Sequence, residues 1–123
     1  MTKLPQYFLM LAVLAALMGM SWGIHMAISQ DHSLAPAHAH LNLVGWVTFS
    51  IFAFYYHLMP SAAASGLAKL HFGLAVAGLV LMIPGIYLAL TQGSEPMAAI
   101  GSILTLLSML TFGVVVLRHG LQR

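Results

Sequence analysis

Charged side chains are scarce in this sequence. They make up 5% of its 123 residues, whereas hydrophobic residues make up 61%. A soluble domain carries about 25% charged residues, so this chain has too few to cover a water-facing surface. The composition therefore predicts an integral membrane protein whose main partner is the lipid bilayer. The net charge is +2 and no basic cluster is present, so nucleic acid is not an expected partner.

Cysteine is absent altogether. Its absence excludes disulfide bonds, thiolate-held iron–sulfur clusters and covalent attachment of haem through Cys-X-X-Cys-His. Any metal ion or haem would have to be held by His or Met, of which the sequence has 7 and 9. Carboxylates are almost as rare, because Asp31 and Glu95 are the only two and both lie between apolar runs. No span therefore carries a carboxylate for proton transfer.

Four apolar runs are each long enough to cross a bilayer, which takes about 20 residues of helix. The predicted spans are residues 7–28, 37–58, 67–90 and 97–117. The segments between them are rich in Gly, Pro and Ser, which end helices, and they are too short to form domains. The sequence thus predicts an all-α fold, a single four-span membrane domain over residues 1–123.

The orientation of the bundle is predicted from the positions of its basic residues. Both carboxylates fall in the first and third connections, whereas the basic residues lie before the first span, between the second and third, or after the fourth: Lys3, Lys69, Arg118 and Arg123. Basic residues favour the cytoplasmic side of a membrane. We therefore expect a multi-pass protein with both termini in the cytoplasm.

The second span opens with Ala-His-Ala-His-Leu-Asn-Leu-Val-Gly at residues 37–45. On an α-helix, residues two apart point about 200° from one another, so His38 and His40 face opposite ways. Such a pair cannot chelate one ion, but it can offer one imidazole to each of two flat cofactors. Asn42 and Gly45 share a face with His38. There Gly45 would let a flat ring approach the backbone, and Asn42 would hold an imidazole or a propionate.

Other histidines lie near the pair and offer an alternative. His25, Met26 and His32 fall at the same end of the bundle as His38. Histidine and methionine together are soft ligands that suit copper, so a copper site at the outer face is one alternative. Another is that these histidines bind water or lipid headgroups at the membrane interface.

His57 and His71 flank the inner loop that joins the second and third spans. Because the loop is short, the two side chains could come within reach of one another. His71 is therefore a further candidate metal ligand at the inner end. Tyr55 and Tyr56 precede His57, and histidines beside tyrosines at a helix end are typical of interfacial anchoring.

The run from Ala37 to Gly45 resembles the tenth helix of the catalytic subunit of haem–copper oxidases. The whole chain resembles small four-span bacterial membrane proteins described as oxidase subunit I-like. In the oxidases, an Ala-His-X-His motif at the outer end of that helix holds two haems, one on each face. The resemblance implies that His38 ligates the iron of the high-spin haem and His40 that of the low-spin haem. It also implies the bacterial inner (cytoplasmic) membrane as location.

The resemblance has a consequence for assembly. The oxidase subunit has twelve helices in a pseudo-threefold ring, and three copies of this chain would supply the same number. It therefore implies a twelve-helix homotrimer in which haem b lies between subunits, held by His40 of one protomer and His38 of the next. The oxidase copper ligands, the His-Pro-Glu-Val-Tyr run and the proton-channel carboxylates are missing here, so no oxygen-reducing activity is expected and enzyme status stays open.

The leading hypothesis is a haem b-binding membrane cytochrome that acts in electron transfer or in redox or gas sensing. A six-coordinate haem suits electron transfer because both axial positions are filled. Its redox partner would be another protein or a quinol. Two alternatives remain: a copper-binding, metal-handling protein using the outer histidines, and a cofactor-free accessory subunit of a respiratory complex.

Overall fold

The computed structural model describes residues 2–121, and every regular element among them is a helix. The elements are α1 (Leu4–Ser29), α2 (Ala35–His40), η1 (Leu41–Thr48), α3 (Phe49–Leu58), α4 (Pro60–Ala63), α5 (Gly66–Gln92) and α6 (Pro96–His119). The second span consists of α2, η1 and α3 in direct succession. Four helices, counting this composite as one, are long and apolar enough to cross a membrane. The predicted all-α, four-span organisation is thus confirmed.

Local chemistry explains where the helices begin and end. Proline occupies one of the first two positions of α1, α2, α4 and α6, where its missing N–H costs no helical hydrogen bond. Helix α5 is capped instead by Ser65, whose hydroxyl oxygen accepts from the Ala68 N–H at 3.2 Å. It ends at Gly93, whose φ of 69° is the left-handed conformation that glycine adopts freely. Pro84 lies within α5, which continues past it to Gln92.

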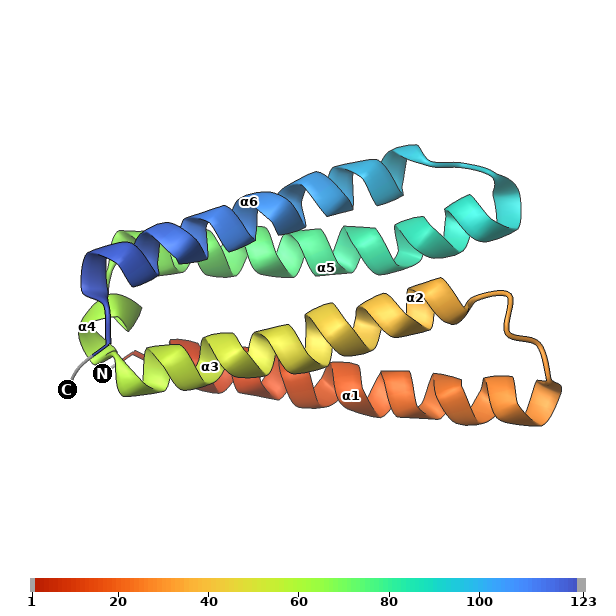
Figure 1. The fold of residues 1–123 in the computed structure, drawn as a ribbon, viewed down its shortest axis with the longest axis horizontal. Helices are drawn as coiled ribbons and strands as arrows, with labels where there is room; N and C mark the ends of the chain where they lie inside the picture. The colour runs from red at the N-terminus through yellow and green to blue at the C-terminus, as the bar shows by residue number, and fades with distance from the viewer. Residues whose placement is uncertain (1, 122–123) are drawn as a thin grey trace.

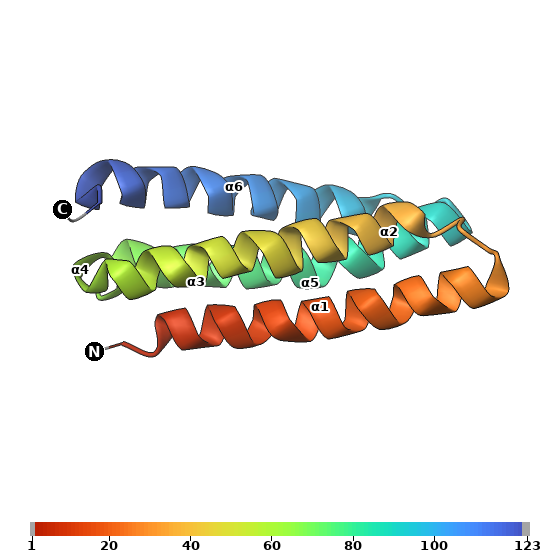
Figure 2. The same cartoon turned by 60° about the horizontal axis from the view of Figure 1, so that its bottom comes forward.

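The spans form two antiparallel hairpins (Figures 1 and 2). Helix α1 packs along η1 and α3, and α5 packs along α6. The short helix α4 lies at the end of the bundle where α1 begins and α6 ends, whereas the first and third connections lie at the opposite end (Figure 1). Basic residues flank the α4 end and both carboxylates flank the other, so the charge separation seen in the sequence is also a separation in space.

The buried core is concentrated toward the α4 end. Phe8 of α1 is fully buried among the rings of Phe49, Phe52, Tyr56 and Phe72, with centroid distances of 5.0–5.9 Å. Most other large apolar side chains are exposed, as expected of helices that face lipid. The second span is the most enclosed, with 39% of its apolar window buried, against 17% for α6. It is therefore the central span of the molecule.

Candidate functional site: the His-X-His helix

The two histidines of α2 occupy opposite environments. His38 is half-buried against α1, and a Cβ added at Gly23 would lie 3.1 Å from the His38 Nε2. His40 is exposed and makes its hydrogen bond within its own helix. The divergence that the two-residue spacing predicts is therefore present. One imidazole meets the neighbouring helix of its own chain, and the other faces away from it.

The His40 ring has a defined tautomer. Its Nδ1 lies 2.7 Å from the carbonyl oxygen of Pro36, one turn earlier. A carbonyl oxygen can only accept, so Nδ1 must carry the proton and donate it. The neutral ring then has its lone pair on Nε2, which makes no hydrogen bond to any residue that the structure describes. Metal-ligating histidines are commonly oriented in this way, by an Nδ1–H donated to a backbone carbonyl.

A π-helical segment follows the histidines directly. Element η1 runs over the eight residues Leu41–Thr48, and the Thr48 hydroxyl donates to the Leu43 carbonyl five residues earlier, at 2.8 Å. π-Helical turns are rare and occur frequently at functional sites. Sequence reasoning treated the whole span as an α-helix and missed this segment, because residue propensities do not distinguish the two helix types.

Asn42 and Gly45 pack against α1 together with His38. The Asn42 side chain lies over Gly19, so that a Cβ there would be 2.5 Å from its Oδ1. At Gly45, a Cβ would lie 2.7 Å from the Cβ of Ala15. The space predicted for a flat ring beside Gly45 is thus filled by α1 in this chain. Asn42 donates its Nδ2 to the His38 carbonyl, at 2.9 Å, rather than to an imidazole ring.

The residues proposed for copper differ in their exposure. His25 and His32 are exposed and Met26 is buried, with 6% of its surface accessible. Across residues 2–121, no three His, Cys, Asp or Glu side chains lie close enough together to hold a metal ion. The outer histidines therefore form no such three-residue group with His38 among these residue types.

The first connection carries a fixed negative charge. The Ser33 backbone N–H donates to the Asp31 carboxylate at 3.0 Å. This hydrogen bond, with a second from the Ser33 side chain, holds the pKa of the Asp31 carboxyl below its usual value, and His32 and His25 lower it further. The connection thus places an ionised carboxylate near two exposed histidines.

His71 is buried rather than interfacial. Its exposed fraction is 0%, and its Nδ1 lies 2.8 Å from the Tyr56 hydroxyl oxygen. The rings of Phe52 and Phe112 enclose it, with centroids 4.3 and 5.2 Å away. Its Nε2 has no hydrogen-bond partner in the described chain. His57, the neighbour expected from the sequence, is exposed instead.

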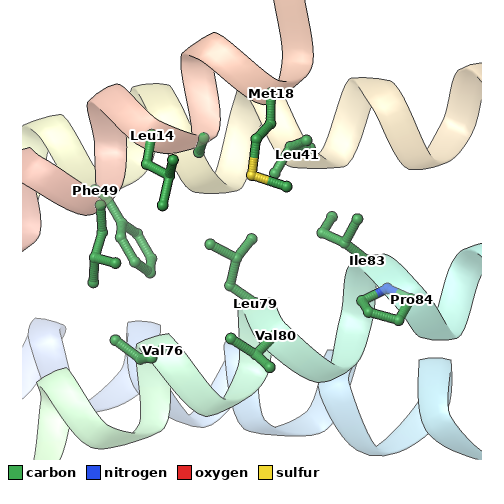
Figure 3. A pocket seen from close by; sticks show the side chains of 11 residues that line it. Leu14, Met18, Leu41, Phe49, Val76, Leu79, Val80, Ile83 and Pro84 are labelled. Atoms are coloured by element: carbon green, nitrogen blue, oxygen red, sulfur yellow. The ribbon is translucent and has the colours of Figure 1, made fainter. Parts of the chain in front are cut away.

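An apolar cleft of about 280 Å³ lies between α1, the second span and α5 (Figure 3). No histidine lines it, and the thioether of Met18 is its one heteroatom-bearing side chain. The cleft therefore offers hydrophobic contact but no strong ligand for a metal. Its lining residues are Leu11, Leu14, Ala15, Met18, Leu41, Phe49, Val76, Leu79, Val80, Ile83 and Pro84.

Comparisons of the chain with protein-family models, with curated proteins and with solved structures found no match.

Proposed function

We propose that this chain is a haem b-binding integral membrane protein that acts in electron transfer or in redox or gas sensing. The observation that carries the proposal is His40. Its ring is exposed, its Nδ1–H is donated to the Pro36 carbonyl, and its Nε2 lone pair is free. These are the features of a histidine ready to ligate haem iron.

The surface beside His40 fits the apolar ring of a haem. Leu43 and Val47, three and seven residues further along the second span, are 62% and 42% exposed. Both lie in η1, within two helical turns of His40, so the span carries exposed apolar side chains between His40 and the middle of the bilayer. A bound haem would supply a one-electron redox change at its iron, which no side chain of this chain supplies.

The second axial ligand would come from another copy of the chain. His38 and His40 face opposite sides of α2, so they cannot ligate the same iron atom within one protomer. We assign the other ligand to His38 of the next subunit in a homotrimer. Because the His38 ring lies over Gly23, it has to turn away from α1 to reach a haem held by a neighbour.

The test is an absorption spectrum of the detergent-purified protein before and after reduction with dithionite, together with a pyridine haemochrome assay. We expect a Soret band and a resolved α-band typical of haem b with two histidine ligands. The His40→Ala and His38→Ala variants should each lose most of the haem. His57→Ala is the matched control, because His57 is exposed at the opposite end of the span and should leave haem content unchanged.

Two outcomes would overturn the proposal. One is a colourless protein after expression with ample haem, which would favour a cofactor-free accessory subunit. The other is a His40→Ala variant that retains the haem content and spectrum of the unaltered chain.

A further inference from the structure

A pocket of about 270 Å³ lies at the end of the bundle where α1 and α5 begin, far from the His-X-His helix. It is lined by Lys3 and Lys69, which are distant in the sequence. The hydroxyl-bearing side chains of Thr2 and Tyr7 line it as well. The fold therefore brings two lysines and two hydroxyl-bearing residues from separate segments to the edge of one largely apolar pocket.

Neither lysine has an anionic partner among residues 2–121. Both are exposed, and no ion pair occurs within the part of the chain that the structure describes. Asp31 and Glu95 lie in the connections at the opposite end of the bundle. The amino-terminal ends of α1 and α5 add the partial positive charge of their helix dipoles. The end of the bundle around the pocket thus concentrates positive charge that a bound anion would relieve.

The rest of the pocket is apolar. Leu4, Ala63 and Phe72 complete its lining, and the Tyr7 ring lies 6.3 Å from the Phe72 ring. Tyr7 is 50% exposed, so its ring also faces the surroundings of the bundle. Since α1 and α5 both cross the membrane, their ends lie at the level of the lipid headgroups. The pocket thus combines cationic donors with hydrocarbon contact at the depth where lipids carry their phosphates.

We propose that this pocket binds the headgroup of an anionic phospholipid. Lys3 and Lys69 contact the phosphate, the hydroxyls of Thr2 and Tyr7 donate to its oxygens, and the Phe72 ring contacts the start of an acyl chain. A free phosphate would use the lysines but leave the apolar lining without a partner, so we assign a lipid. Basic pockets between transmembrane helices bind anionic lipid headgroups by the same combination of contacts. The site uses none of the histidines and does not depend on haem.

The test is a titration of the full-length protein in a neutral detergent with fluorescently labelled phosphatidylglycerol, compared with labelled phosphatidylcholine. We expect tighter binding of phosphatidylglycerol, weakened by added salt. Each basic residue near a membrane surface contributes about fivefold in affinity, so Lys3→Gln and Lys69→Gln should each weaken binding by about that factor. Lys69→Arg should retain it. Arg118→Gln is the matched control, because Arg118 is a basic residue at the same end that does not line the pocket.

Any of three outcomes would overturn the proposal. Equal binding of the two lipids would mean that charge is not recognised. An equal loss in the Arg118→Gln variant would mean that overall charge, rather than the pocket, attracts the lipid. Competition by inorganic phosphate as effective as by phosphatidylglycerol would assign the site to a free anion. Circular dichroism of each variant verifies that the helices remain folded.

Discussion

The imidazoles of His40 and His71 differ in exposure and in hydrogen bonding. His40 is exposed, with its Nδ1–H donated to a backbone carbonyl of its own helix and its Nε2 left available. His71 is enclosed by aromatic rings, and its one hydrogen bond is to the Tyr56 hydroxyl. An imidazole that has to reach a cofactor needs the first arrangement. The second connects α3 to α5 inside the core, because Tyr56 and His71 come from different spans.

The Tyr56–His71 contact gives a prediction about stability. Tyr56→Phe removes the hydroxyl and leaves both ring nitrogens of His71 buried without partners. Leaving a buried polar group unsatisfied costs about 1–3 kcal/mol, so the free energy of unfolding should fall by that amount. The measurement is thermal or denaturant unfolding in detergent, followed by circular dichroism.

A double variant separates the hydrogen bond from the packing of the rings. Tyr56→Phe combined with His71→Phe replaces both partners by apolar rings and should recover part of the lost stability, since no polar group is then left unpaired. A Tyr56→Phe variant as stable as the unaltered chain would show that the hydrogen bond contributes little.

The hairpin of α5 and α6 depends on close contact between the two backbones. A Cβ added at Gly85 would collide with the backbone of Ala98, and one added at Gly101 would collide with the backbone of Met82. Helices in membranes associate largely through van der Waals packing, and glycine allows their backbones to approach closely. These two glycines therefore set the distance between α5 and α6.

Substitution of these glycines by alanine should destabilise the hairpin. Gly→Ala in a helix interior ordinarily stabilises by up to about 1 kcal/mol through helix propensity. At Gly85 and Gly101 the forced separation of the backbones should outweigh this gain, with a net loss of about 1–3 kcal/mol typical of overpacking. Thermal unfolding in detergent measures the change.

Gly113 provides the control within α6. A Cβ added there would meet nothing within 4 Å, so Gly113→Ala should be neutral or stabilising. If all three alanine variants raised the melting temperature, helix propensity rather than backbone contact would explain the result.

The sequence predicts the spans well because a bilayer demands long apolar runs, and prolines and Gly93 mark where the helices begin and end. It does not predict which face of each helix packs inward. In a soluble protein the polar face reveals this, but here lipid-facing and buried surfaces are both apolar. The burial of His71, the packing of Asn42 over Gly19 and the meeting of Lys3 with Lys69 all depend on this choice of face.

The molecule as a whole leaves much of its apolar surface uncovered by its own chain. Only 17% of the apolar window of α6 is buried, and Leu43 and Val47 are exposed on the same span as His40. Lipid alone can cover such a surface, and so can further copies of the chain. The proposed homotrimer would use the His40 surface as part of an interface between subunits, and haem binding would then depend on assembly.

Mixed trimers test this dependence. In a closed ring each subunit contacts its two neighbours through different surfaces, so His40 of one protomer always faces His38 of the next. A His38→Ala chain retains His40, and a His40→Ala chain retains His38. Each variant alone should lose most of its haem, but co-expression should restore one complete site in every trimer that contains both. The measurement is haem content per chain by pyridine haemochrome, with the oligomeric state determined by light scattering.

Failure of the two variants to complement one another, or a monomer that carries a full complement of haem, would rule out a site shared between subunits. If both ligands came from one protomer, co-expression would restore no haem, because every variant chain would still lack one of its two histidines.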